Sequence, residues 1–152
     1  AVPTNLDDLL RAAHDVVRKR SVVFVVSDFI SRPGWAETLA KLAMRHDVIA
    51  VRLYDPLEME LPDLGLLLIQ DSETGEQVFV DTHDKGFRKR FRELAEKREE
   101  ELRDAFRQSG VDALELATDD DLVDAIMRFA DLRKRRSQLA TGGGIPQHMN
   151  LT

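Results

Sequence analysis

Two aspartates follow apolar segments that are typical of buried strands. Asp28 stands two residues after Val22–Val26, and Asp55 stands two residues after Val48–Leu53. In an open parallel sheet, ligands bind beyond the carboxyl ends of the strands, and Mg²⁺ accepts carboxylate oxygens as ligands. Asp28 is therefore a candidate ligand for a metal or a partner. The alternative is that Asp28 only caps the turn into the next helix.

Thr4 is the second candidate metal ligand, because a threonine hydroxyl just before a helix is suited to coordinating Mg²⁺. The same position favours an N-cap, a role that Asn5 could share. The cluster Asp81-Thr82-His83-Asp84 has the residue types of an acid/base or metal site. It lies where a strand gives way to a helix, however, and there Thr82 or Asp84 is expected to act as a cap.

The charged runs are expected to be structural. Lys97–Glu101 is predicted to be a solvated helix face. Arg133–Arg136 suits the carboxyl end of a helix dipole, with binding of an anionic partner as the alternative. No glycine-rich phosphate loop follows the first apolar segment, no Gly-x-Ser-x-Gly elbow occurs, and no second aspartate stands two residues after Asp28. We therefore predict a binding module with no catalytic residue and no cofactor of its own.

The composition restricts the classes of partner. The length of 152 residues suits one domain, and the formal net charge of -6 argues against nucleic acid as a ligand. The sequence contains no cysteine, which excludes disulfides and thiolate metal sites. No apolar run approaches the roughly 18 residues that span a bilayer, so no membrane segment is predicted.

The first half of the chain predicts alternating helices and buried strands. Apolar residues at helical spacing indicate a helix over Leu6–Lys19, and the β-branched run Val22–Val26 indicates a strand buried on both faces. A second helix is expected to begin near Pro33-Gly34, and Val48–Leu53 forms the next buried strand. Two such units in a row favour a parallel sheet with right-handed crossovers.

The second half adds a hairpin and further helices. The apolar segments Leu66–Ile69 and Val78–Val80 predict a β-hairpin with Gly75 at positive φ. A long helix then runs to Gly110, and residues 113–117 form a short strand. We expect Thr118 to cap the last helix, with Asp121 in a capping box, and a flexible tail over 137–152. The predicted fold is α/β, a doubly wound and mainly parallel sheet with an added β-hairpin.

Several segments together resemble a known bacterial family. They are Arg20–Phe29, Arg45–Leu53 followed by Asp55-Pro56, then Leu61-Pro62, Gly65, Asp71-x-Glu73-Thr74-Gly75-Glu76 and Val80-Asp81-Thr82. In this combination they resemble the family catalogued as domain of unknown function fifty-eight, over about Thr4 to Arg136. That family is similar to a divergent von Willebrand factor A domain, and its members are associated with MoxR-type AAA+ ATPases as assembly or chaperone-like adaptors.

The resemblance implies a Rossmann-like sheet whose rim holds a divalent cation at a metal-ion-dependent adhesion site. Such a site combines an Asp-x-Ser-x-Ser loop, a threonine before a helix and an aspartate after the fourth strand. Thr4 matches the second part and Asp28 the third, while no Asp-x-Ser-x-Ser occurs in the sequence. The resemblance therefore implies that residues 1–136 form such a domain without its first strands. It implies an incomplete metal site here, with Mg²⁺ bound in the full-length protein.

The function that follows is that of a protein-binding adaptor, whose partner, such as an AAA+ ATPase, contacts Asp28, Phe29 and Asp55. The resemblance implies a bacterial, cytoplasmic protein, with a membrane anchor in the longer parent as an open alternative. The apolar edge at Val22–Val26 carries no charge or proline and is expected to mediate self-association. The alternatives are a Mg²⁺-dependent phosphoryl-transfer or hydrolytic enzyme that uses Asp28, and a purely structural oligomerisation domain.

Overall fold

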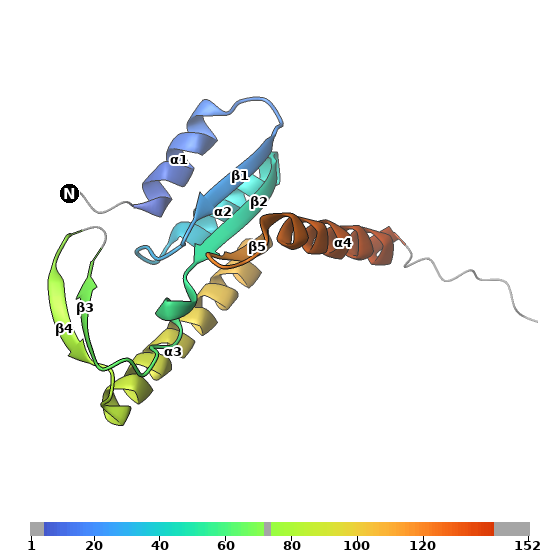
Figure 1. Ribbon diagram of the computed structural model, residues 1–152. Helices are drawn as coiled ribbons and strands as arrows, with labels where there is room; N and C mark the ends of the chain where they lie inside the picture. Colours follow the sequence, from blue (N-terminus) through green and yellow to red (C-terminus); the bar gives the residue numbers. More distant parts are fainter. Residues whose placement is uncertain (1–4, 72–73, 142–152) are drawn as a thin grey trace, which may run out of the picture. The chain divides into compact units, whose positions relative to one another are not determined.

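A computed structural model describes residues 5–71 and 74–141. Contacts divide the chain into two compact units, unit 1 (Ala1–Asp119) and unit 2 (Asp120–Thr152), and each is described by itself. Within the described residues, no helix has both the length and the apolar character needed to cross a membrane. Unit 2 contains one described helix, α4 (Leu122–Thr141). The elements of unit 1 are, in order, α1 (Leu6–Val16), β1 (Val22–Ser27), α2 (Trp35–Arg45), β2 (Asp47–Tyr54), the 3-10 helix η1 (Pro56–Glu58), β3 (Leu66–Gln70), β4 (Gln77–Asp81), α3 (Lys85–Ser109) and β5 (Asp112–Ala117) (Figure 1).

Unit 1 contains a three-stranded parallel sheet and a separate antiparallel hairpin. The parallel strands lie in the order β1-β2-β5, with Val25 opposite Ala50 and Val51 opposite Leu114. The hairpin pairs β3 with β4, with Leu68 opposite Phe79. The predicted class, an α/β fold with a parallel sheet and an added hairpin, is therefore confirmed.

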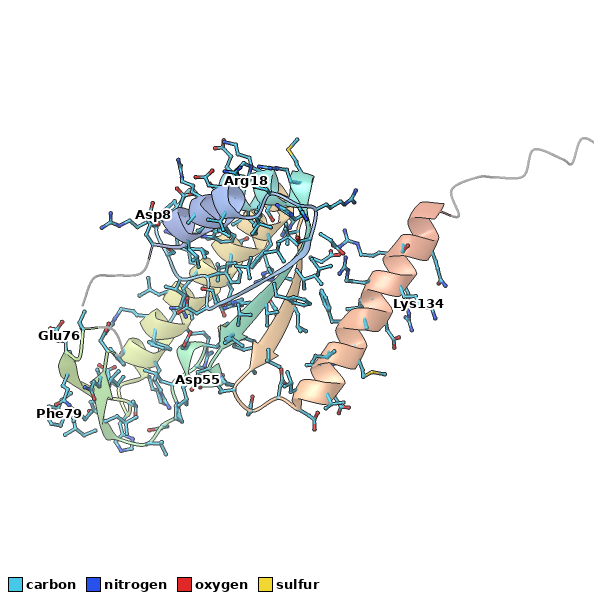
Figure 2. The ribbon with its side chains drawn as sticks, turned by 90° about the horizontal axis from the view of Figure 1, so that it is seen from above. Asp8, Arg18, Asp55, Glu76, Phe79 and Lys134 are labelled. Atoms are coloured by element: carbon cyan, nitrogen blue, oxygen red, sulfur yellow. The ribbon has the colours of Figure 1, made fainter. Side chains whose placement is uncertain are left out.

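One face of the parallel sheet carries the hydrophobic core. Helices α1, α2 and α3 each bury leucines against Val25 and Ala50 of the strands (Figure 2). The opposite face of β1 is exposed at Val22, Phe24 and Val26. The prediction that β1 is buried on both faces is therefore wrong for unit 1. Side chains of a strand alternate between its faces, and the three helices of this unit that the structure describes pack on the Val25 side alone.

Most predicted elements are present, and their ends differ in places for local reasons. Helix α1 ends at Val16 rather than Lys19, because Val17 is extended and a pair of β-branched residues disfavours a helix. Gly75 and Gly110 adopt the predicted positive φ, at 74° in the hairpin turn and 66° at the end of α3.

The last helix begins differently from the prediction. Asp121, rather than Thr118, acts as its cap, because the Asp121 carboxylate accepts hydrogen bonds from Val123 N at 2.9 Å and Asp124 N at 3.1 Å. Helix α4 continues to Thr141, through the first part of the predicted tail. The remainder of that segment, 142–152, lies outside the described residues.

Candidate functional site

The candidate site is the edge of the parallel sheet at the carboxyl ends of its strands. In the β1–β2 register, Ser27 lies opposite Arg52, so the segments that begin at Asp28 and Asp55 leave the sheet at the same edge. The segment after β1 leads into α2, and the segment after β2 leads into η1. Parallel strands place both connections on one rim because their carboxyl ends point in the same direction.

The loop after β1 is shaped by its own polar side chains. Asp28 Oδ1 accepts a hydrogen bond from Ile30 N at 2.9 Å, and Ser27 Oγ accepts one from Phe29 N at 3.0 Å. Ser31 Oγ accepts a hydrogen bond from Leu6 N at 3.1 Å and so joins the loop to the beginning of α1. The side chain of Asp28 is exposed. It therefore caps the turn with one oxygen and presents its carboxylate to solvent.

The other predicted site residues do not complete a cation site. Asp55 caps η1 through a hydrogen bond from Leu57 N to Asp55 Oδ1 of 2.9 Å, and Thr4 lies outside the described residues. Asn5 caps α1 by accepting from Asp7 N at 3.2 Å, as expected. Among residues 5–71 and 74–141, no group of three or more histidine, aspartate or glutamate side chains is placed to hold a metal ion. The described residues alone therefore do not fit a Mg²⁺ site.

Phe29 turns its ring into the protein interior. Its side chain is 1% exposed and packs against Trp35 and Phe106, with ring centroids 5.2 and 4.9 Å away. Its φ of 59° is unusual for a residue with a side chain, and such a conformation costs about 1–3 kcal/mol unless the surroundings enforce it. Here the aromatic packing enforces it. Phe29 was predicted to contact a partner. Its buried ring instead supports the rim from beneath.

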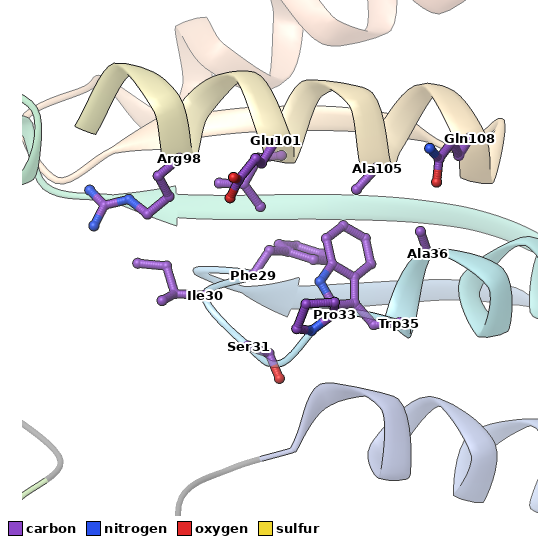
Figure 3. A pocket seen from close by; sticks show the side chains of 12 residues that line it. Phe29, Ile30, Ser31, Pro33, Trp35, Ala36, Arg98, Glu101, Ala105 and Gln108 are labelled. Carbon is purple, nitrogen blue, oxygen red and sulfur yellow. The ribbon is translucent and has the colours of Figure 1, made fainter. Parts of the chain in front are cut away.

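A pocket of about 240 Å³ lies between this loop and α3. The rings of Phe29 and Trp35 form its apolar floor, and Ile30 and Pro33 extend the apolar lining along the loop. Figure 3 shows the side chains on α3 extending toward the loop from the other side. The lining residues that come from α3 are Arg98, Glu101, Leu102, Ala105 and Gln108.

Arg98 places hydrogen-bond donors at one end of the pocket. Its Nη2 donates to the backbone oxygen of Glu58 at 3.1 Å. Its buried Nε has no hydrogen-bond acceptor in the part of the chain that the structure describes. A buried N–H without an acceptor costs about 1–3 kcal/mol, so a carbonyl or carboxylate that reaches it would be favoured. The pocket thus combines an apolar floor with a cationic end.

The same part of α3 anchors the helix to the sheet. Arg52 of β2 is 2% exposed and forms a paired hydrogen bond with both carboxylate oxygens of Glu99. Burial alone would lower the pKa of the Arg52 guanidinium, but the hydrogen bonds and charge of Glu99 outweigh it and raise that pKa. The prediction that Lys97–Glu101 is a solvated helix face is therefore wrong for Glu99, because β2 supplies a buried cation opposite it.

The cluster at the hairpin base is structural. Asp84 caps α3 by accepting from Gly86 N at 2.8 Å and Phe87 N at 3.2 Å, which confirms one of the two expected caps. Thr82 is fully buried, and its hydroxyl donates to Gly65 O at 2.7 Å. His83 pairs with Asp63, a residue that sequence analysis did not single out. These contacts tie the two ends of the hairpin to the beginning of α3.

Sequence analysis missed the α3 wall of the pocket. Arg98, Glu101, Ala105 and Gln108 recur every three or four residues, beside the apolar stripe of the helix. That spacing places them on one face. The small residue Ala105 within an otherwise polar row was the available signal that this face approaches another segment.

Comparisons with known proteins identify one family model and several uncharacterised relatives. A family model described as "Protein of unknown function DUF58" matches residues 1–101. An uncharacterised protein of Mycobacterium avium is 35% identical over 118 residues, which cover 78% of this chain and 69% of that protein. Uncharacterised proteins of Mycobacterium bovis and Mycobacterium tuberculosis are 34% identical over 118 residues, and the chain spans only 37% of their length. No solved structure matches the chain.

Proposed function

The chain belongs to the family described as protein of unknown function DUF58, and on this premise we propose that it is a protein-binding adaptor module whose contact surface is the rim at the carboxyl edge of the parallel sheet. The observation that carries the proposal is the pocket between the β1–α2 loop and α3. Its apolar floor suits one large apolar side chain of a partner, and such buried anchors supply most of the binding energy of protein interfaces. The Nε–H of Arg98, which has no acceptor among the described residues, would donate a hydrogen bond to a carbonyl or carboxylate next to that anchor.

Two further features support a contact at this rim. The strained conformation of Phe29 shows that the loop is held in one shape, and a preformed loop loses little conformational entropy when it binds. Asp28 lies exposed beside the pocket loop and offers a carboxylate to a cationic group of the partner. The proposal gives no catalytic role to Asp28 and assigns no step to a bound metal.

The partner that we propose is a MoxR-type AAA+ ATPase. The support for this choice is the similarity of several segments to a divergent von Willebrand factor A domain, in which the sheet rim is the binding surface. The exposed rim of this chain and its pocket are compatible with that role. A MoxR-type AAA+ ATPase is therefore the first partner to test.

The test compares rim variants of the full-length protein in binding to that ATPase. Ile30 lines the pocket and is exposed, so Ile30→Asp places a charge against the expected apolar anchor. We expect this change to weaken binding by about 30-fold, equivalent to the roughly 2 kcal/mol that defines an anchor residue. Asp28→Ala should weaken binding by about threefold to tenfold, as expected for a charge at the rim of an interface.

Met44→Asp is the matched control, because Met44 is exposed on α2 and does not line the pocket. Isothermal titration calorimetry gives the affinities, and circular dichroism melting checks that the variants fold. If Ile30→Asp and Met44→Asp bind as tightly as the unaltered protein, the rim is not the contact surface.

Self-association through β1 is a second candidate function, which the exposed apolar face of this strand favours. Val22, Phe24 and Val26 are exposed, and β1 pairs only with β2 among the described strands. Unprotected strand edges recruit further strands. Analytical ultracentrifugation of the chain tests this candidate, because Phe24→Lys should then shift it toward monomer, whereas a monomeric unaltered chain at tens of micromolar would exclude it.

A further inference from the structure

The segment between β2 and α3 has an extreme charge pattern. Residues 55–84 contain nine aspartates and glutamates, one histidine (His83) and no lysine or arginine, in a chain whose total formal charge is -6. Near its ends, carboxylates are paired with cations of α3, Glu60 with Arg92 and Asp63 with Arg88. Glu76, which precedes β4, and Asp81, the last residue of β4, have no ion pair in the part of the chain that the structure describes. The hairpin therefore carries uncompensated negative charge at both ends of β4.

Between these two charges the hairpin is apolar and uncovered. Leu66, Leu68 and Phe79 are exposed on one face, and Val78 and Ile69 are exposed on the other. Figure 2 shows Glu76 and Phe79 on the outer side of the hairpin, away from the helices that cover the sheet. A two-stranded hairpin by itself is marginally stable in water. This one therefore keeps apolar surface available that an added strand would bury.

The edge of β4 has few of the devices that prevent strand addition, since Asp81 at its end is its one charged residue. Its five residues contain no lysine and no proline, and its ladder with β3 runs in continuous register without a bulge. Among the described strands β4 pairs only with β3, and Figure 1 shows it as the outer strand of the hairpin. Exposed edges of this kind accept extended peptides through backbone hydrogen bonds.

Hydrogen bonds and ion pairs hold the base of the hairpin, so that the edge of β4 is already ordered before a partner binds. Thr82 N and Thr82 Oγ both donate to Gly65 O, at 2.8 and 2.7 Å, and Leu64 N donates to Thr82 Oγ at 3.0 Å. Arg88 and His83 hold Asp63 on the α3 side. Because the base is already ordered, an added strand would lose only its own conformational freedom on binding.

From these observations we infer that the outer edge of β4 binds an extended segment of a protein partner that has an apolar centre of about five residues, the length of a typical strand, and lysine or arginine at both ends. The apolar centre would cover Val78 and Phe79, and the basic ends would face Glu76 and Asp81. A second copy of the hairpin is a poor occupant, because it would bring further negative charge to an edge that already carries Glu76 and Asp81. This inference goes beyond the proposed function, since it concerns a separate surface and does not depend on the rim.

The probe is the synthetic peptide acetyl-Lys-Lys-Val-Thr-Val-Thr-Val-Lys-Lys-amide, added to the isotopically labelled protein. We expect amide shifts in NMR spectra that concentrate in β4, and slower hydrogen exchange along that strand. Two matched peptides sharpen the test. One replaces the lysines with glutamates, and the other carries N-methyl groups at all five central residues, so that neither of its edges can pair as a strand. Both are expected to bind at least about tenfold more weakly, equivalent to 1.4 kcal/mol.

Two protein variants carry the same change of charge. Glu76→Lys alters the hairpin, whereas Glu96→Lys alters an exposed position on α3. Glu76→Lys should weaken binding of the lysine peptide by about threefold or more, as expected for reversal of an exposed charge, and Glu96→Lys should not. The inference is wrong if the peptide causes no shifts at about 1 mM, if the N-methylated peptide binds equally well, or if both variants respond alike.

The rim variant Ile30→Asp separates this inference from the proposed function. It should leave binding of the lysine peptide unchanged, because Ile30 lies in the pocket loop and not on the hairpin. Loss of ATPase binding with intact peptide binding supports both proposals. Intact peptide binding with no ATPase binding by the unaltered protein removes the rim alone.

Discussion

The parallel sheet and the hairpin are both built from apolar strands, but they use those side chains differently. In the sheet, Val25 and Ala50 are buried beneath three helices. In the hairpin, Leu68 and Phe79 form a cross-strand pair that remains exposed. The sheet is therefore stabilised by its core, whereas the hairpin is held mainly by hydrogen bonds and ion pairs at its base. The difference indicates that apolar strand residues stabilise the fold in the sheet, whereas in the hairpin they form a surface that a partner could cover.

Two phenylalanines give the largest expected contrast between these regions. Phe29 is 1% exposed, and Phe79 is 68% exposed. Phe29→Ala should lower the free energy of unfolding by about 3–5 kcal/mol, because it removes a buried ring and leaves a cavity. Phe79→Ala should change it by no more than about 0.5 kcal/mol, as expected for a surface substitution. Urea denaturation followed by circular dichroism measures both, and equal losses would show that the hairpin is as well packed as the sheet.

The buried ion pair is the next way to test the comparison. Arg52→Met should destabilise the protein by about 3 kcal/mol, because it leaves the carboxylate of Glu99 buried without its cation. The double variant Arg52→Met with Glu99→Leu should recover most of that loss, since it removes both charges. Lys41→Met breaks the exposed pair with Glu37 and serves as the control, with an expected change of about 0.3–0.5 kcal/mol. A double variant as unstable as the single one would mean that the loss does not come from leaving the Glu99 carboxylate unpaired.

The sequence predicted the elements of both regions better than their surroundings. Local patterns were sufficient for the parallel strands, for the turn at Gly75 and for the end of α3 at Gly110, because these depend on neighbouring residues. The exposed face of β1 was not predictable in this way. A continuous apolar run such as Val22–Val26 shows that both faces are apolar, but it does not show which face a helix of the same unit covers.

The candidate site was predicted only in part for a related reason. Asp28 and Asp55 were correctly expected at one edge, since topology follows from the order of elements. The pocket joins Trp35 to α3, and the pair Arg52–Glu99 joins residues 47 positions apart. Such contacts depend on how α3 crosses the sheet, and the charged run around Glu99 carries no local sign of a buried cation opposite it.

Acid should loosen the hairpin base before it affects the sheet, which is the smallest effect expected here. The hydrogen bond with His83 and the charge of Arg88 lower the pKa of Asp63 below its ordinary value of 3.8. A carboxylate with a lowered pKa in the folded state stabilises that state above its ordinary pKa. This contribution is lost as the pH falls through the folded pKa. Between about pH 5 and that lower pKa, the amide resonances of Gly65 and Thr82 should shift while those of β2 stay constant. Asp63→Asn should abolish the transition, because its side chain does not titrate, and the same transition in that variant would assign it to another group.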